Sequence, residues 1–224
     1  MIRDNLARVL ESIEQAKSRY GVKDSIELVA VSKYSDTKAI QEAFKCGQNI
    51  FGENKVQDLV YKKQELNNSN IKWHFIGTLQ ENKINALLLT KPDLIHSLHS
   101  LKLANALQKR LFRDGITLRA LLQVNSANED SKHGFDIEST LDGYLEIIQT
   151  CPNIKLVGLM CMGAQSNDTS LIEKSFLKTQ RLFEKLKPYN AHVLSMGMSG
   201  DYEIAIASGS NCVRIGSSIF RSQL

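Results

Sequence analysis

Apolar residues recur every three to four positions over the first twenty residues of the chain. Ile2, Leu6, Val9 and Ile13 fall on one side of a helix, and this spacing predicts an amphipathic helix that begins near residue 2. Gly21 follows the last apolar position, and a glycine directly after a helix is typical of a helix end. The pattern therefore predicts a helix that precedes the rest of the fold.

Beyond this helix, short apolar runs alternate with longer stretches of helical periodicity. The runs that predict strands are residues 27–32, 49–52, 72–76, 94–97, 118–124, 154–161, 191–195 and 212–215. The helical patterns between them are residues 36–46, 54–66, 80–90, 100–113, 136–150, 170–187 and 200–208. Strands that alternate with helices favour a parallel sheet, and eight such units in 224 residues favour closure. We expect an α/β protein, a single (β/α)8 TIM barrel domain over residues 1–224 with an extra N-terminal helix.

A doubly wound open sheet is the alternative for the same alternation. Its dinucleotide-binding form carries G-x-G-x-x-G after the first strand, and no such motif occurs there. Asp36, Ser100 and Asp136 stand where helix N-caps are expected, and Gly47 and Gly115 stand where helices end. The absent motif favours the barrel.

Composition narrows the class of protein further. The chain is 42% hydrophobic and 23% charged, and it has no apolar run of the ~20 residues that span a bilayer. The first twenty residues lack an apolar signal core, so we expect the cytoplasm. The four cysteines form no C-x-x-C pair, which favours reduced thiols over a disulfide or a zinc site. A dispersed net charge of +4 argues against nucleic acid and allows a small anionic ligand.

Lys33 stands at the carboxyl end of the first predicted strand. Strand side chains alternate between faces, so Val29, Val31 and Lys33 share one face. The neutral form of an amine condenses with a carbonyl to a Schiff base, and an apolar face favours that form. An ordinary salt bridge at a strand end is the alternative. Because barrel sites lie at the carboxyl ends of the strands, Lys33 is the candidate nucleophile for an aldehyde or ketone.

Glycines and serines gather after the last two predicted strands. Gly197, Gly200 and Gly216 allow a backbone to approach a ligand, and Ser199 and Ser217 add hydroxyl donors. Loops after strands seven and eight are the usual phosphate cradle of this barrel, at the starts of helices. The glycines could instead serve ordinary turns, but their clustering favours a phosphate.

Arg214 lies on the last predicted strand, on the opposite face from Val213 and Ile215. A guanidinium inside a barrel mouth requires an acceptor, and a ring nitrogen or an anion would supply one. An aldehyde for Lys33, a phosphate for the glycine loops and a ring nitrogen for Arg214 together indicate pyridoxal 5′-phosphate. Beside an arginine the ring nitrogen stays unprotonated, which favours carriage or racemase-like chemistry over aminotransfer.

Several segments of the chain resemble the pyridoxal-phosphate homeostasis proteins, relatives of the alanine racemase N-terminal barrel. These segments are AVSK at 30–33, GENKVQ at 52–57, WHFIGTLQENK at 73–83, QVN at 123–125, SKHGF at 131–135, SMGMSGD at 195–201 and VRIG at 213–216. The resemblance implies that Lys33 is the aldimine lysine, that Ser199 and the backbone of Gly216 and Ser217 hold phosphate, and that Arg214 faces the pyridine nitrogen. It places Asn54 near the cofactor.

The chain departs from the family in two places. Arg221 follows Phe220 where the family usually has a glycine, and the loop at residues 162–164 lacks a proline that is common there. By resemblance, a monomeric protein binds pyridoxal phosphate and influences its free level without established turnover. Apo-enzymes that accept the cofactor are candidate partners, and we expect neither nucleic acid nor a membrane as a partner.

Two rival functions stay open. One is a pyridoxal-phosphate-dependent amino-acid racemase with weak activity, which would need a tyrosine that racemases take from a second β domain; the sequence leaves no residues for that domain. The other is a cofactor-free barrel that binds another phosphate or nucleic acid.

Four further residues have ordinary and functional interpretations. His74 is a candidate cofactor contact, although a hydrogen-bonded core histidine suits its apolar strand better. Methionines at the strand ends mostly suit filling of the barrel, and Met198 is a candidate for contact with the cofactor ring. Glu53 either pairs with a lysine near the mouth or is a charge at a helix start. Lys62 is expected on a solvated helix face.

Overall fold

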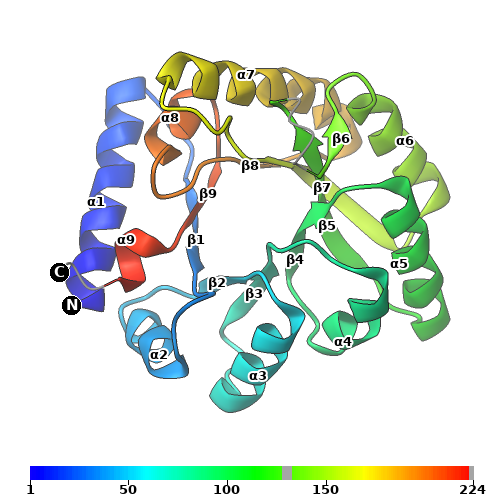
Figure 1. Cartoon of the computed structure of the whole chain (residues 1–224), viewed down its shortest axis with the longest axis horizontal. Helices are drawn as coiled ribbons and strands as arrows, with labels where there is room; N and C mark the ends of the chain where they lie inside the picture. Colours follow the sequence, from blue (N-terminus) through cyan, green and yellow to red (C-terminus); the bar gives the residue numbers. More distant parts are fainter. Residues whose placement is uncertain (128–132, 222–224) are drawn as a thin grey trace.

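Eight parallel strands close into a barrel in the computed structural model, which describes residues 1–127 and 133–221 (Figure 1). The barrel strands are β1 (Glu27–Val31), β2 (Ile50–Glu53), β3 (Lys72–Phe75), β4 (Leu94–Leu98), β5 (Leu118–Asn125), β7 (Ile154–Cys161), β8 (Val193–Ser195) and β9 (Cys212–Ile215). Their order is β4-β3-β2-β1-β9-β8-β7-β5, and a pairing of β4 with β5 closes the ring. The expected (β/α)8 barrel is confirmed.

Helices surround the barrel on its outer side (Figure 1). They are α1 (Ile2–Tyr20), α2 (Thr37–Lys45), α3 (Val56–Leu66), α4 (Ile84–Leu89), α5 (Leu101–Asp114), α6 (Thr140–Thr150), α7 (Thr169–Leu186), α8 (Tyr202–Ala207) and α9 (Ser217–Phe220), with short 3-10 turns at Glu81–Lys83 and Lys187–Tyr189. The Asp36 carboxylate accepts from the N–H of Ala39, and the Ser100 hydroxyl accepts from that of Leu103. Gly115 ends α5 in the left-handed conformation at φ 65°. These two N-caps and this helix end are as predicted.

The predicted N-cap at Asp136 is wrong. Residues Phe135–Asp136 form a two-residue strand, β6, that pairs with β5 and lies outside the ring. Because this pairing keeps the chain extended, α6 begins later, at Thr140, with Ser139 as its N-cap. The backbone oxygen of Asp136 still contributes, since it accepts from the Thr140 hydroxyl at 2.7 Å.

The apolar core lies between the strands and the surrounding helices. Trp73, Phe51, Phe75, Tyr144 and Phe176 are its largest fully buried side chains, and each buried side chain of this size contributes about 1.5–3 kcal/mol. Residues on the other face of the strands point into the barrel and form two smaller clusters, made of Leu94, Leu121, Val157 and Met160, and of Val29, Ile50 and Cys212. This alternation follows from the period-two geometry of a strand.

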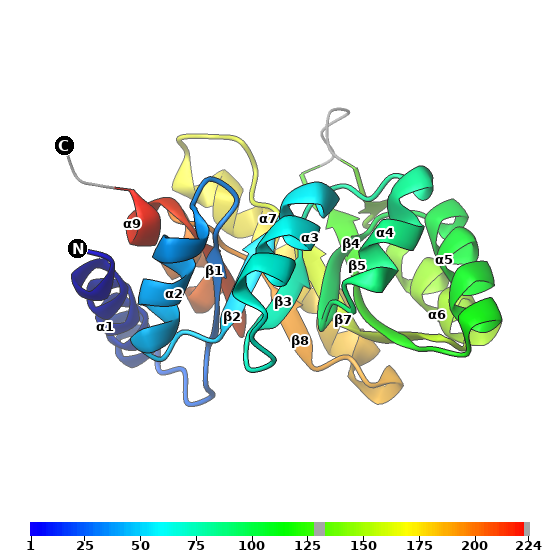
Figure 2. The ribbon, with the colours of Figure 1, turned by 90° about the horizontal axis from the view of Figure 1, so that it is seen from below.

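Helix α1 is the additional element of the barrel. It packs against α8 and α9, which brings the start of the chain beside its last helix (Figures 1 and 2). The buried amide of Asn5 on α1 donates to the backbone oxygen of Ile219 on α9 at 3.0 Å. Among the described helices, none has both the length and the apolarity that a membrane span requires.

Candidate functional site

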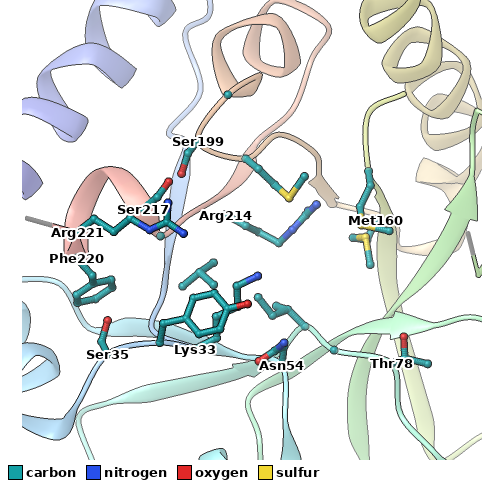
Figure 3. Close-up of a pocket in the computed structure, with 18 of the residues that line it drawn as sticks. Lys33, Ser35, Asn54, Thr78, Met160, Ser199, Arg214, Ser217, Phe220 and Arg221 are labelled. Carbon is teal, nitrogen blue, oxygen red and sulfur yellow. The ribbon is translucent and has the colours of Figure 1, made fainter. Parts of the chain in front are cut away.

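A cavity of about 690 Å³ opens at the carboxyl ends of the barrel strands. This volume lies in the range of small-molecule sites. Figure 3 shows its lining. The residues predicted for the site that line this one cavity are Lys33, Asn54, Met198, Ser199, Arg214, Gly216 and Ser217. The fold thus brings together side chains from the first strand, the second strand and the last two loops.

Lys33 follows β1 and reaches into the cavity half-buried. Its Nζ lies 5.0 Å from the centre of the Tyr34 ring, a cation–π distance. Within the described ranges of the chain, Lys33 makes no ion pair with a carboxylate. The described residues therefore do not support the alternative that Lys33 forms an ordinary salt bridge, and its amine is available to a ligand.

The charge of the cavity lining is positive. Lys33, Arg214 and Arg221 contribute three basic side chains, and no aspartate or glutamate is among the described residues that line the cavity. Hydroxyl groups of Ser35, Thr78, Ser199 and Ser217 add neutral donors. A site with basic groups and without acids attracts anions.

The turns after β8 and β9 depend on glycine. Gly197 has φ 93°, and a Cβ there would lie 2.7 Å from that of Ala205. A Cβ on Gly216 would lie 2.7 Å from the backbone oxygen of Val31. The Asp201 carboxylate accepts from the N–H of Met198 at 2.6 Å and so fixes the loop that carries Ser199. These contacts place the two serines on the same side of the cavity (Figure 3).

Arg214 finds its acceptors within the protein, whereas the sequence led us to expect one from a ligand. Its Nη1 donates to the backbone oxygen and the hydroxyl of Ser195, at 2.9 and 2.6 Å, and its Nη2 donates to the backbone oxygen of Cys161 at 3.0 Å. The side chain is 5% exposed. A guanidinium has five N–H donors, so Arg214 is held firmly and still keeps Nε–H and one Nη2–H for a ligand.

A chain of hydrogen bonds continues from Arg214 into the barrel. Ser195 Oγ lies 3.0 Å from His96 Nδ1, and His96 Nε2 lies 3.0 Å from His74 Nδ1. Because Arg214 donates to Ser195, the serine hydroxyl can donate to His96, which then donates to His74. Burial lowers the pKa of His96 well below its usual value, and it lowers that of His74 to about 3. Both rings are therefore neutral at pH 7.

His74 is not among the residues that line the cavity. It lies on β3, is buried in the barrel interior and takes part in the histidine chain beneath Arg214. The structure therefore does not bring this candidate into the cavity lining. The core interpretation of His74 fits the geometry.

A buried ion pair behind the first two strands joins Glu53 to Lys62, so of the two interpretations of Glu53 the pairing with a lysine holds. Lys62 is 6% exposed, so its expected place on a solvated face is wrong. Its Nζ donates to Glu53 Oε1 at 2.7 Å and to the backbone oxygen of Ser32 at 2.8 Å. Ser32 Oγ also donates to Glu53 Oε1, at 2.6 Å. The signal was present, because Val56, Leu59 and Lys62 recur every three residues on the buried face of α3.

Glu53 is fully buried, and burial raises its pKa above the usual 4.5, although Lys62 and Ser32 oppose the shift. The ion pair holds the backbone directly before Lys33 and directly before Asn54. It is therefore a support for two residues that line the cavity.

Further residues also line the cavity, and of these the sequence predicts only Gly200 as a possible ligand contact. They are Val31, Tyr34, Ser35, Ile76, Gly77, Thr78, Gln123, Met160, Met162, Gly200, Phe220 and Arg221. The Gln123 amide donates to the backbone oxygen of His133 at 2.8 Å. Of the family-like segment 131–135, residues 131 and 132 lie outside the described residues. All four cysteines are free thiols in the structure, and three of them are buried.

The sequence of this barrel matches the model of a known protein family. The model of the alanine racemase N-terminal domain matches residues 4–223, and the chain belongs to this family. An alanine racemase from Corynebacterium glutamicum shares the fold at 16% identity and a TM-score of 0.75, covering 99% of this chain and 61% of its own.

Relatives with higher sequence identity narrow the class of protein further. The pyridoxal phosphate homeostasis protein of Helicobacter pylori is 51% identical over 219 residues, 98% of both chains, and that of Escherichia coli is 38% identical over 225 residues, 98% of this chain and 95% of its own. PipY of Synechococcus elongatus, solved with pyridoxal phosphate bound, has a TM-score of 0.83 at 28% identity, covering 99% of this chain and all of its own. The resemblance to the pyridoxal phosphate homeostasis proteins is confirmed.

Proposed function

We propose that this chain binds pyridoxal 5′-phosphate as a Schiff base on Lys33 and acts in storing and delivering it. The observation that carries the proposal is an amine that has no carboxylate partner among the described residues, in a cavity whose described lining holds two arginines and no acid. In the condensation, the neutral amine adds to the aldehyde carbon, a C=N bond forms and water leaves. The names of the homeostasis-protein relatives and the ligand of PipY support the same cofactor.

The donor set fits each end of this cofactor. Ser199, Ser217 and the backbone at Gly216 suit the phosphate, which prefers hydroxyl and backbone N–H donors. The free donors of Arg214 suit the ring nitrogen. Asn54 and Met198 belong to the wall that would flank the ring. An arginine does not give up its proton, so the ring nitrogen stays unprotonated and the bound cofactor is a weak electron sink.

Carriage suits this arrangement better than turnover. Tyr34 is 81% exposed and Met198 is 42% exposed, although both line the cavity. A ligand behind such an open mouth is accessible to another amine, which can displace Lys33 from the aldehyde. Delivery to apo-enzymes in the cytoplasm, where free thiols such as the four found here persist, follows from this proposal.

The test is the absorbance of the purified protein with added pyridoxal phosphate. A protonated lysine Schiff base absorbs near ~420 nm, and this band should vanish in Lys33→Ala and persist in Lys38→Ala, a change at an exposed lysine of α2. Borohydride reduction followed by peptide mass mapping should place the label on Lys33. A wild-type protein without the band, or a label on another lysine, would overturn the proposal.

A weak racemase is the second candidate, favoured by one observation. Tyr34 lines the cavity next to Lys33, so a tyrosine is present beside the lysine within this chain. Chiral separation of alanine after incubation with the loaded protein decides between the two functions. Steady turnover that Tyr34→Phe abolishes would favour the racemase; absence of turnover would favour the carrier.

A further inference from the structure

Arg221 stands at the phosphate side of the cavity. It directly follows α9, and its side chain lines the cavity together with Ser199 and Ser217. Figure 3 shows the Arg221 side chain extending into the cavity beside Ser217 and near Ser199, on the side opposite to Thr78 and Met160. The guanidinium therefore lies where the proposed function places a phosphate.

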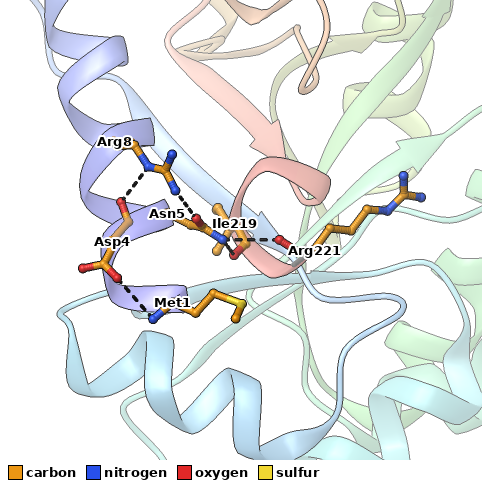
Figure 4. A network of polar contacts seen from close by, with 6 residues as sticks. All are labelled: Met1, Asp4, Asn5, Arg8, Ile219 and Arg221. Atoms are coloured by element: carbon orange, nitrogen blue, oxygen red, sulfur yellow. Dashed lines mark hydrogen bonds and ion pairs between the residues drawn. The ribbon is translucent and has the colours of Figure 1, made fainter. Parts of the chain in front are cut away.

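The backbone of Arg221 is anchored from two directions. Its N–H donates to the backbone oxygen of Ser217 at 3.1 Å, which closes α9. Its own backbone oxygen accepts from the Asn5 amide on α1 at 3.4 Å, and the same amide donates to Ile219 (Figure 4). Asn5 is buried. Helix α1 thus fixes the point from which the Arg221 side chain enters the cavity.

The Arg221 guanidinium has no competing partner. Within residues 1–127 and 133–221 it makes no ion pair and no side-chain hydrogen bond. The other two cations of the cavity have different tasks, since Lys33 would bond to the aldehyde and Arg214 gives three of its donors to the protein. Among the described basic residues that line the cavity, Arg221 is therefore the one whose charge is available to the phosphate.

We propose that Arg221 makes this cavity selective for a phosphate monoester dianion over the unphosphorylated aldehyde, an inference that rests on the proposed function. A guanidinium presents a planar fork of donors that matches phosphate oxygens. A phosphate monoester carries about −1.5 to −2 charges at pH 7, and its second proton is lost near pH ~6. Pyridoxal has the same ring and aldehyde but a hydroxyl in place of this group, so it isolates the contribution of the phosphate.

The experiment compares two ligands and three variants. Pyridoxal phosphate and pyridoxal are titrated against wild type, Arg221→Gln, Arg221→Lys and Arg113→Gln, with the Schiff-base band as the signal. Arg113→Gln removes one positive charge from an exposed side chain of α5, a helix that lies across the barrel from α9 (Figure 1). Because Arg221 is exposed, its replacement by glutamine should weaken the binding of pyridoxal phosphate by only about five- to tenfold. The affinity for pyridoxal should change less than about twofold.

Further readouts separate a ligand contact from a structural effect. Arg221→Lys should retain part of the preference for the phosphorylated ligand, and Arg113→Gln should retain all of it. The effect of Arg221→Gln should shrink when salt screens the charge, and again at pH 5, where the phosphate is a monoanion. Circular dichroism should show that Arg221→Gln is folded, since its side chain contacts no described partner.

The outcomes distinguish the two proposals. If Arg221→Gln leaves the ratio of the two affinities unchanged, for example by weakening the binding of both ligands equally, the proposed role of Arg221 is overturned. The carrier function still stands in that case. Wild-type protein that forms a Schiff base with neither ligand would overturn the carrier function itself, and the role of Arg221 with it.

Discussion

Replacing Lys62 by methionine tests the buried ion pair behind the first two strands. Methionine keeps most of the side-chain length but removes the donors to Glu53 Oε1 at 2.7 Å and to the Ser32 backbone oxygen at 2.8 Å. Glu53 is fully buried, so its carboxylate would keep only the Ser32 hydroxyl as a described partner. Loss of one member of a buried pair costs about 3–5 kcal/mol, mostly because the other charge stays buried.

The cost should depend on pH in a definite direction. Burial raises the pKa of Glu53 above its usual 4.5, while Lys62 and Ser32 hold it down. Without Lys62 the pKa rises further. A carboxyl whose folded pKa exceeds its unfolded value contributes stability that is complete below the unfolded pKa and is lost as pH rises through the folded pKa. We expect a deficit of about 3 kcal/mol at pH 8 that falls to about 1–2 kcal/mol at pH 5.5.

Urea unfolding followed by circular dichroism measures the deficit. With a slope of about 2–3 kcal/mol/M, the midpoint of Lys62→Met should fall by about 1–1.5 M at pH 8. Lys63→Met makes the same chemical change at the next, half-buried residue of α3 and should stay within about 0.5 kcal/mol. Glu53→Gln added to Lys62→Met should recover most of the loss. Equal stability of Lys62→Met and wild type at pH 8 would refute the role of the pair.

Two other predictions concern glycines at the cavity and the histidine chain. A Cβ on Gly77 would overlap the Asn54 carbonyl, so Gly77→Ala should lose at least about 3 kcal/mol; Gly200→Ala, where a Cβ meets nothing within 4 Å, should keep the thermal midpoint within about 2 °C. The pKa of His74 is lowered from 6.5 to about 3 by burial. The contribution of neutral His74 to the free energy of unfolding is complete above pH 6.5. It is lost as the pH falls below this value, by about 1.4 kcal/mol per pH unit. His74→Gln should therefore flatten the loss of stability between pH 6.5 and 5 in urea titrations, and an unchanged slope would contradict neutral histidines.

Local sequence patterns determine most element boundaries of this fold. Helix α1 begins and ends where the apolar spacing and Gly21 place it. Strands β5 and β7 match their apolar runs to within one residue, because both of their faces are buried and few polar residues interrupt them. Strand β6 could not be predicted in this way. Its two residues are extended because they pair with β5, and no local pattern records a pairing partner.

The candidate site was predictable where topology alone decides position. The carboxyl ends of parallel strands meet at one end of a barrel, so residues following different strands, such as Lys33 and Ser199, converge in one cavity. Side-chain pairing within that end was not predictable. The acceptors of Arg214 come from β7 and β8, and Lys62 reaches Glu53 and the first strand from α3. Such partners depend on the packing of elements that are distant in sequence.

The anion preference of the cavity depends on where the protein places its acids. Glu53 ends β2 directly before Asn54, yet its carboxylate pairs with Lys62 and does not line the cavity. Arg214 is held by neutral acceptors, so its charge is oriented without being neutralised. A carboxylate at either place would cancel part of the attraction for a phosphate. A net charge of +4 spread over the chain would not produce this preference by itself. Three basic side chains around a cavity whose described lining holds no acid do produce it.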